Sequence, residues 1–290
     1  MNAAAPPLFG PAPRLDGRDG LVYRFLMAVT SGGEHDELWR GLLTGQESPI
    51  KHDRGRYKRL PGAPRCKTCL VPLGGSFAPL VRVLIKRAPS RKNPNYCNVC
   101  EEFVRTHPGG AEIELSLLFA DVRGSTSLGE AMSPGEFTRL MNRFFDSSNK
   151  ILIDSDAMVD KLVGDEVIGL YLPLMGADHA RRSIEAGRML LVATGHESPE
   201  GPWLPVGVGV HTGVAYVGAV GSRDTVSDFS AMGDAVNVTA RLASLAGKGE
   251  VLVSEAAHHA SGLDLADLET RKLELKGRQA PMTVRIIRVP

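Results

Sequence analysis

The sequence lacks a secretory signal, an unbroken apolar run long enough to span a membrane, and any excess of charge. Residues 1–13 carry neither a basic segment nor a useful apolar run. The longest uncharged stretch, 201–222, is interrupted by six glycines, two prolines and a histidine, so it predicts paired strands. With 43% hydrophobic and 23% charged residues, the chain is of ordinary globular composition and not fibrous or collagen-like. We therefore expect a folded cytoplasmic protein without membrane contact.

The near-zero net charge of +1 hides an uneven distribution along the chain. Before Gly110 there are 17 Lys and Arg against 9 Asp and Glu, and from there on 17 against 24, which gives +8 and −7. Such asymmetry indicates two modules with different partners. We expect a flexible Ala- and Pro-rich leader over 1–19, a regulatory module over 20–108 and a second domain over 111–290, joined by the His-Pro-Gly-Gly linker at 107–110.

All four cysteines fall into two Cys-x-x-Cys pairs, Cys66/Cys69 and Cys97/Cys100. Disulfides are not expected in a reducing compartment, whereas four thiolates at this spacing can surround one ion. We expect a structural Zn²⁺ site, with an iron–sulfur cluster or reduced redox thiols as alternatives. The segment between the pairs is longer than usual for a zinc ribbon, so an insertion must be accommodated there.

Two basic segments accompany the cysteines. Residues 51–65 pack six Lys or Arg among Gly and Pro, which favours a solvated loop over an anion-contacting arm. Between the cysteine pairs lies a second basic stretch, which consists of Arg82, Lys86, Arg87, Arg91 and Lys92. Tyr96 lies near it in the sequence. We expect a solvated face, and nucleic-acid binding by this module is the alternative.

Beyond the linker, apolar patterning predicts strands alternating with helices. Strands are expected at 113–120, 157–162, 167–172, 204–210, 213–220, 251–254 and 282–289, and helices at 133–153, 178–194 and 234–245. Ser133 and Pro134 suit a helix start, and Gly164-Asp165 suits a hairpin turn. Before the linker, 21–30 and 36–43 have helix-like spacing. The fold class is α/β, an α+β sandwich with helices packed on a mixed sheet.

Carboxylates stand where two of these strands end. Asp121 follows the first strand and precedes a small-residue loop that contains Val122, Gly124, Ser125 and Thr126. Backbone N–H groups of such a loop can cradle phosphate, and a carboxylate beside it can hold a divalent cation. Asp165 lies at the hairpin turn. Each aspartate alone is equally typical of a turn or cap.

Asn237 and Arg241 stand four residues apart on one predicted helix face. An amide and a guanidinium together are suited to bind a ribose and the pentavalent phosphate of a transfer reaction. An exposed polar helix face explains the spacing alone equally well.

Four segments, in order and spacing, resemble the catalytic domain of class III nucleotidyl cyclases over about 113–289. They are Leu-Leu-Phe-Ala-Asp-Val-Arg-Gly-Ser-Thr at 117–126, Lys-Leu-Val-Gly-Asp at 161–165, Val-Gly-Val-His-Thr-Gly at 208–213 and Met-Gly-Asp-Ala-Val-Asn-Val-Thr-Ala-Arg-Leu at 232–242. The resemblance implies a ferredoxin-like βαββαβ core that is active as a head-to-tail homodimer.

The resemblance also implies roles for individual residues. Asp121 and Asp165 would hold two Mg²⁺ or Mn²⁺ ions, Lys161 would read the purine, Asn237 would orient the ribose, and Arg241 would stabilise charge on the α-phosphate. In the family the metal pair comes from one subunit, and the purine, ribose and transition-state residues come from the other. A monomer should therefore be inactive.

The sequence departs from the family pattern at two places. The second purine-reading position falls on Ser230, whose hydroxyl can still meet an adenine amino group, and Lys161 favours ATP over GTP. An arginine that some members use on the terminal phosphates aligns with Gly207, so Lys276 or Arg278 would replace it.

We therefore expect an adenylate cyclase with a metal-stabilised regulatory module. One alternative is a diguanylate cyclase, suggested by Gly-Asp-Glu-Val at 164–167 but without that family's full signature. Another is a weak or inactive cyclase fold that binds nucleotide or dimerises, with a cysteine region that binds nucleic acid or a partner.

Overall fold

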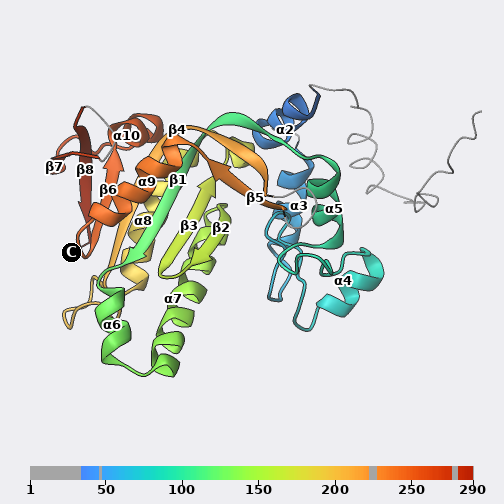
Figure 1. Cartoon of the computed structure of the whole chain (residues 1–290), viewed down its shortest axis with the longest axis horizontal. Coiled ribbons are helices and arrows are strands. Elements are labelled where there is room, and N and C mark those ends of the chain that lie inside the picture. Colours follow the sequence, from blue (N-terminus) through green and yellow to red (C-terminus); the bar gives the residue numbers. More distant parts are fainter. Residues whose placement is uncertain (1–33, 46–47, 222–226, 276–279, 290) are drawn as a thin grey trace, which may run out of the picture.

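A single mixed β-sheet with helices on both faces organises the chain (Figure 1). The computed structural model describes residues 34–45, 48–221, 227–275 and 280–289. Within them the strands pair in the order β2-β3-β1-β4-β6-β8-β7, and β5 pairs with β4. The predicted leader 1–19 and the helix-like stretch 21–30 lie outside the described residues.

The N-terminal part is helical. Its helices are α2 (Glu34–Thr44), α3 (Pro49–Tyr57), α4 (Ala78–Leu84) and α5 (Asn98–Thr106). The first cysteine pair lies between α3 and α4 and the second at the start of α5, and the linker then leads into the sheet.

The sheet region starts with a βαββαβ unit. Its elements are β1 (Gly110–Val122), α6 (Ser125–Ala131), α7 (Pro134–Asp154), β2 (Met158–Val163), β3 (Glu166–Tyr171), the 3-10 helix η1 (Pro173–Met175), α8 (His179–Ala193) and β4 (Val206–Gly221). The remaining elements are β5 (Ser227–Met232), α9 (Asp234–Leu245), β6 (Glu250–Ser254), α10 (Glu255–Ser261), β7 (Thr270–Leu273) and β8 (Met282–Arg288). The predicted α/β fold with a ferredoxin-like core is confirmed.

Local sequence signals explain several of these elements. Ser133 accepts from the Glu136 backbone N–H, Glu136 binds back to the Ser133 N–H, and Pro134 occupies the first helical turn, so α7 begins where predicted. Gly164 adopts φ +63° in the turn that joins β2 to the antiparallel β3. The predicted capped helix and hairpin are therefore confirmed.

The prediction of two strands at 204–210 and 213–220 is wrong, because β4 is one continuous strand. It pairs with β1 without interruption from Val206 opposite Val122 to Gly218 opposite Gly110. The glycines that suggested a turn permit close packing instead: a Cβ on Gly209 would lie 2.4 Å from the Ala243 backbone nitrogen of α9.

The expectation of a solvated loop or arm over 51–65 is also wrong. Most of this segment's first half is α3, and Arg54 on it is fully buried. Its guanidinium donates to the carbonyl oxygens of Thr68 at 3.0 Å and Ala157 at 2.6 Å, which replace water as acceptors. Burial lowers the pKa of Arg54 to about 10. This basic residue therefore joins the module to the sheet.

Two hydrophobic cores lie on opposite faces of the sheet, because alternate residues of β1 point to opposite sides. Leu118, Ala120 and Val122 pack with α7 and α8. Leu115, Leu117 and Phe119 belong to the other core, which also contains residues from the N-terminal module: Trp39, Leu43, Tyr57, Cys66, Cys69 and Cys97. The predicted division near Gly110 stays a prediction, and the packing across it is continuous.

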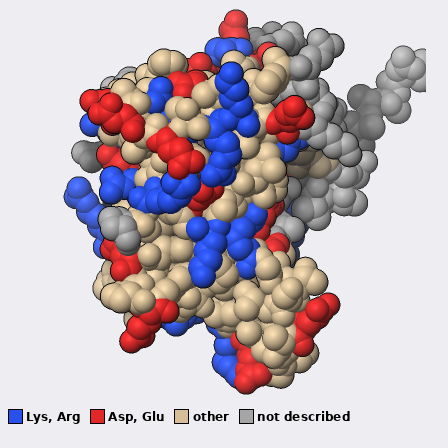
Figure 2. All heavy atoms as spheres, turned by 90° about the vertical axis from the view of Figure 1, so that its left-hand side faces the viewer, with Lys and Arg blue, Asp and Glu red and all other residues tan. Residues whose placement is uncertain are grey.

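The far edge of the sheet carries charges of both signs. Figure 2 shows acidic and basic side chains interspersed over this side of the molecule. At this edge of the sheet, Glu250 lies 2.9 Å from Arg271 and 2.7 Å from Arg288, and Arg288 lies 2.6 Å from Glu269. These ion pairs connect β6, β7 and β8, so the charged side chains link neighbouring strands at the edge of the sheet.

Candidate active site and cysteine cluster

Two aspartates from separate strand ends meet at one end of the sheet. Asp121 is the last residue but one of β1, where it pairs with Glu166 on β3 and with Gly207 on β4. Asp165 lies in the β2–β3 turn, and its carbonyl oxygen accepts from the Val122 backbone N–H at 3.3 Å. The βαββαβ order thus brings together carboxylates that are far apart in the sequence.

The electrostatics of this end show an excess of negative charge. Burial raises the pKa of Asp121, and the charge of Asp165 raises it further, while Arg123 opposes both. Burial and the charges of Asp121 and Asp165 likewise raise the pKa of Glu166. Oxygen donors that disfavour their own ionisation in this way fit a hard divalent cation, which would relieve the repulsion.

Arg123 is the cation already present here, and the sequence interpretation did not single it out. Its Nη2 lies 2.5 Å from Asp121 Oδ2, and its Nη1 donates to the Ser244 carbonyl oxygen at 2.8 Å. The guanidinium therefore links the proposed metal carboxylate to the C-terminal end of α9. Its position two residues after Asp121 was the only sequence signal for this role.

The small-residue segment after β1 is a helix start as well as a loop. Gly124 has φ +70° at the N-cap of α6, and Ser125 is the first residue of that helix. The Ser125 hydroxyl donates to the Asp165 carboxylate, Val122 is buried, and Thr126 is exposed. The structure therefore places this segment directly beside the carboxylate pair.

Asn237 and Arg241 lie on α9, one turn apart. Asn237 is exposed and Arg241 is half-buried. Within the described part of the chain, neither side chain has a hydrogen-bonding or ion-pair partner. The helix is anchored on an adjoining face by buried Val238 and Leu242. An amide and a guanidinium held this way are available to a ligand.

The other predicted substrate residues are placed unequally. Ser230 is buried on β5, and its hydroxyl donates to Asp160 Oδ2 at 2.7 Å. Lys161 lies on β2, but its side chain is outside the described part of the structure, as are Lys276 and Arg278 entirely. The strands that carry Ser230 and Lys161 are near one another, since β2 and β5 are in contact.

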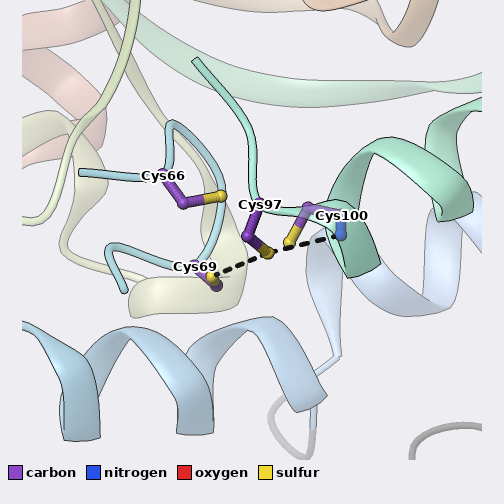
Figure 3. A group of neighbouring side chains, drawn as sticks. All are labelled: Cys66, Cys69, Cys97 and Cys100. Carbon is purple, nitrogen blue, oxygen red and sulfur yellow. Dashed lines mark hydrogen bonds between the residues drawn. The ribbon is translucent and has the colours of Figure 1, made fainter. Parts of the chain in front are cut away.

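The four cysteines converge from two turns (Figure 3). Their Sγ atoms all lie within 4.8 Å of one another, and Cys69 Sγ is 3.8 Å from Cys97 Sγ. Leu70 adopts φ +63° after the first pair, and Cys97 caps α5 by accepting from the Cys100 N–H at 3.5 Å. Cysteines separated by residues 70–96 therefore form one group that can hold a metal ion.

The surroundings of Cys97 favour a thiolate at that position. Hydrogen bonds from Cys100, Cys66 and Cys69 hold the pKa of Cys97 well below its ordinary value. Arg87 Nη1 lies 3.5 Å from Cys97 Sγ, and its other terminal nitrogen pairs with Asp53 at 2.7 Å.

The prediction of a solvated face is therefore wrong for Arg87 and for the neighbouring Tyr96. Arg87 is buried beside the cysteines, and Tyr96 is buried with its hydroxyl on Asp228. Both residues serve internal contacts, because each finds its polar partner inside the protein.

Among the described helices, none combines the length and the apolar character needed to cross a membrane.

A βαββαβ sheet with one aspartate near the end of β1, a second in the β2–β3 turn, and an Asn/Arg pair on α9 that has no side-chain partner among the described residues defines a class III nucleotidyl cyclase domain. The chain belongs to the adenylate and guanylate cyclase catalytic domain family, whose model matches residues 111–288.

Curated relatives carry the same class of name. An adenylate cyclase of Anabaena cylindrica is 30% identical over 146 residues, which are 45% of this chain and 27% of the relative. An adenylate cyclase of Mycobacterium tuberculosis (strain ATCC 25618 / H37Rv) is 29% identical over 167 residues, 57% of this chain and 37% of the relative. The matches thus span only about a third of these relatives' length.

Solved structures agree in fold. The guanylyl cyclase Cya2 superposes with a TM-score of 0.57 at 25% identity, covering 61% of this chain and 93% of that one. The adenylyl cyclase CyaB from P. aeruginosa gives 0.54 at 26% identity, covering 62% and 96%. One of these neighbours is a guanylyl cyclase and the other is an adenylyl cyclase, so the likeness in fold does not decide between ATP and GTP.

Proposed function

We propose that the protein is an adenylate cyclase, which converts ATP to 3′,5′-cyclic AMP and pyrophosphate at the interface of a homodimer. The observation that carries the proposal is the convergence of Asp121 and Asp165 at one sheet end, together with Asn237 and Arg241 side chains that have no partner in the described part of the structure. Charge to hold cations and free groups to hold a nucleotide are both needed for this reaction.

The chain's own residues divide the work of cyclisation. Asp121 and Asp165 would hold two Mg²⁺ or Mn²⁺ ions, and these ions would supply activation of the ribose 3′-hydroxyl and neutralisation of the triphosphate. Backbone N–H groups of Gly124, Ser125 and Thr126 contact the phosphates, whereas the Val122 N–H already donates to the Asp165 carbonyl oxygen. Lys276 and Arg278 are the candidates for the terminal phosphates.

Residues of α9 complete the site from the second subunit. Asn237 orients the ribose so that its 3′-oxygen lies in line with the α-phosphorus and the departing pyrophosphate. Arg241 donates to the α-phosphate oxygens as charge builds there. No side-chain base would be required, because bound cations would lower the pKa of the 3′-hydroxyl and its proton would then pass to solvent water.

Adenine is the proposed base because of two strand residues. Lys161 on β2 and Ser230 on β5 face the purine in this proposal. The Ser230 hydroxyl is small enough to admit a 6-amino group, and it already gives its proton to Asp160.

The cysteine cluster is proposed to hold one structural Zn²⁺. Four thiolates about 2.3 Å from one ion at tetrahedral angles lie about 3.8 Å apart. The Cys69–Cys97 separation is 3.8 Å. An iron–sulfur cluster inserts iron and sulfide atoms between the thiolates and spreads them further, so a single ion suits the observed spacing better.

The test is a product assay on the full chain. Purified protein is incubated with ATP or GTP and Mn²⁺ or Mg²⁺, and the products are identified against cyclic nucleotide standards. Cyclic AMP that disappears in Asp165→Ala supports the proposal, with Asp154→Ala, an exposed aspartate at the end of α7, as the matched control. A folded dimer with bound metal that makes no cyclic nucleotide contradicts it.

A further inference from the structure

Lys67, which directly follows Cys66, reaches out of the cysteine module into the catalytic sheet. Its ammonium donates to Asp160 Oδ1 at 3.0 Å on β2, to Asp228 Oδ1 at 3.0 Å on β5 and to the Phe229 carbonyl oxygen at 2.7 Å. The Lys67 side chain is 9% exposed and that of Asp160 is 6% exposed. A buried cation from one part of the chain thus holds together two strands of the other.

The second cysteine pair contributes to the same contact. Tyr96, which precedes Cys97, donates its hydroxyl proton to Asp228 and accepts from the Phe229 backbone N–H at 2.9 Å. Both cysteine turns therefore place a neighbouring residue on β5, immediately before Ser230.

All three ammonium protons of Lys67 have acceptors. The residue therefore has no donor left for a nucleotide, and its role is to position its partners. With Oδ1 of Asp160 occupied by Lys67, Oδ2 is left to accept the Ser230 hydroxyl proton at 2.7 Å.

This arrangement fixes the hydrogen-bonding character of Ser230. A hydroxyl has one proton, and once that proton is given to a carboxylate only the oxygen lone pairs remain for a ligand. Adenine carries an amino donor at C6, whereas guanine carries a carbonyl acceptor at the same position. A Ser230 held as an acceptor can bind the first and faces lone pair to lone pair with the second.

We propose that Asp160, oriented by Lys67, is a specificity-determining residue that locks the Ser230 hydroxyl as an acceptor and so selects a 6-amino purine over a 6-oxo purine. The inference rests on the proposed function, in which Ser230 faces the base. It adds that the cysteine module, through Lys67, sets the base preference of the catalytic sheet.

The experiment compares the ratio of kcat/KM for ATP to that for GTP in a set of variants. Asp160→Leu removes the acceptor, leaves Lys67 paired with Asp228, and frees the Ser230 proton to reach a guanine carbonyl. We expect the ATP:GTP ratio to fall about ten-fold, the effect of one hydrogen bond. Lys67→Met is expected to lower it in the same direction.

Two controls separate base selection from general damage. Lys58→Met breaks another contact between the module and the sheet region, the 2.9 Å pair with Asp156, and should leave the ratio unchanged. In a Ser230→Ala background, Asp160→Leu should produce no further change in the ratio, because Asp160 acts through that hydroxyl.

A ratio that Asp160→Leu leaves unchanged, or that it changes equally with and without Ser230, overturns the inference while the proposed function stands. If the wild-type chain makes neither cyclic nucleotide, the proposed function fails, and competition of ATP and GTP against a fluorescent ATP analogue decides the inference alone. Preference for ATP that is lost in Asp160→Leu supports it, and equal competition in the wild type overturns it. A melting curve for each variant identifies any that do not fold, and Asp160→Ala, which also lacks an acceptor, then replaces Asp160→Leu.

Discussion

Arg123 places its guanidinium 2.5 Å from the carboxylate of Asp121, one of the two carboxylates proposed to hold metal ions. The pair balances part of the negative charge that Asp121, Asp165 and Glu166 share. A cation entering the site therefore meets a carboxylate that already has a partner.

Replacing Arg123 by Gln should strengthen metal binding. The variant loses the competing charge but keeps a donor for the Ser244 carbonyl oxygen. We expect the half-saturating Mn²⁺ concentration to fall about five-fold, the effect of about 1 kcal/mol of charge repulsion. Titration followed by the electron paramagnetic resonance of free Mn²⁺ measures it, with the exposed Arg139→Gln on α7 as control. Weaker Mn²⁺ binding in Arg123→Gln would contradict this role.

Metal binding should depend on pH above the usual aspartate range. Burial and the charge of Asp165 raise the pKa of Asp121 above its ordinary 3.8, so protons compete with metal at higher pH than at an exposed aspartate. Without metal, the protein should lose stability as pH rises through this raised pKa, because folding disfavours the ionised form, and Mn²⁺ should restore it. Melting temperatures with and without Mn²⁺, measured from about pH 4, near the ordinary pKa of an aspartate, up to neutral pH, test both effects.

The Asp165→Asn variant provides the check on that cause. It removes a charge that raises the pKa of Asp121, so the titration of the metal-free protein should move to lower pH. A titration that stays in place would mean that Asp165 does not act on Asp121.

Loss of one cysteine should remove the metal and loosen the protein. We expect about one zinc per wild-type chain by elemental analysis and none in Cys97→Ser. Because Cys66, Cys69 and Cys97 belong to the core shared with β1, the variant should also melt at lower temperature. Thr68→Ser, between the first two cysteines, is the matched control and should keep its zinc. Iron with acid-labile sulfide in the wild type would instead support a cluster.

Two inactive variants should complement each other. If each site takes Asp165 from one subunit and Arg241 from the other, a mixed dimer of Asp165→Ala and Arg241→Ala has one intact site. Random mixing then gives about a quarter of wild-type activity, from half the dimers with half their sites. Each variant alone should be inactive, and mixed dimers verified by two affinity tags that remain inactive would refute the shared site.

Periodicity and turn residues predicted most of the sheet region, because its signals are local. The α7 cap at Ser133 and the turn at Gly164 depend on nearby residues only. The single strand β4 was missed because Gly209 is required by close packing against α9, which is distant in the sequence. Local patterns carry no information about such an approach.

The carboxylates and cysteines were predictable as groups, whereas their partners were not. Cysteine spacing alone indicated the cluster that Figure 3 shows. By contrast, Arg54 and Lys67 look like solvated charges in the sequence, and only their acceptors on Ala157 and Asp160 reveal buried roles. A cation's meaning depends on which oxygens the fold brings to it.

Trp39 and Tyr57 share a core with Leu115 and Leu117, and this shared core limits how the two parts of the chain can be separated or recombined. Cutting the chain before β1 would leave an apolar sheet face open to water, and such faces lead to aggregation. Grafting the cysteine module onto another cyclase would require a matching face to receive it. The two parts are therefore expected to change in concert, substitution by substitution, and not to be shuffled as independent cassettes.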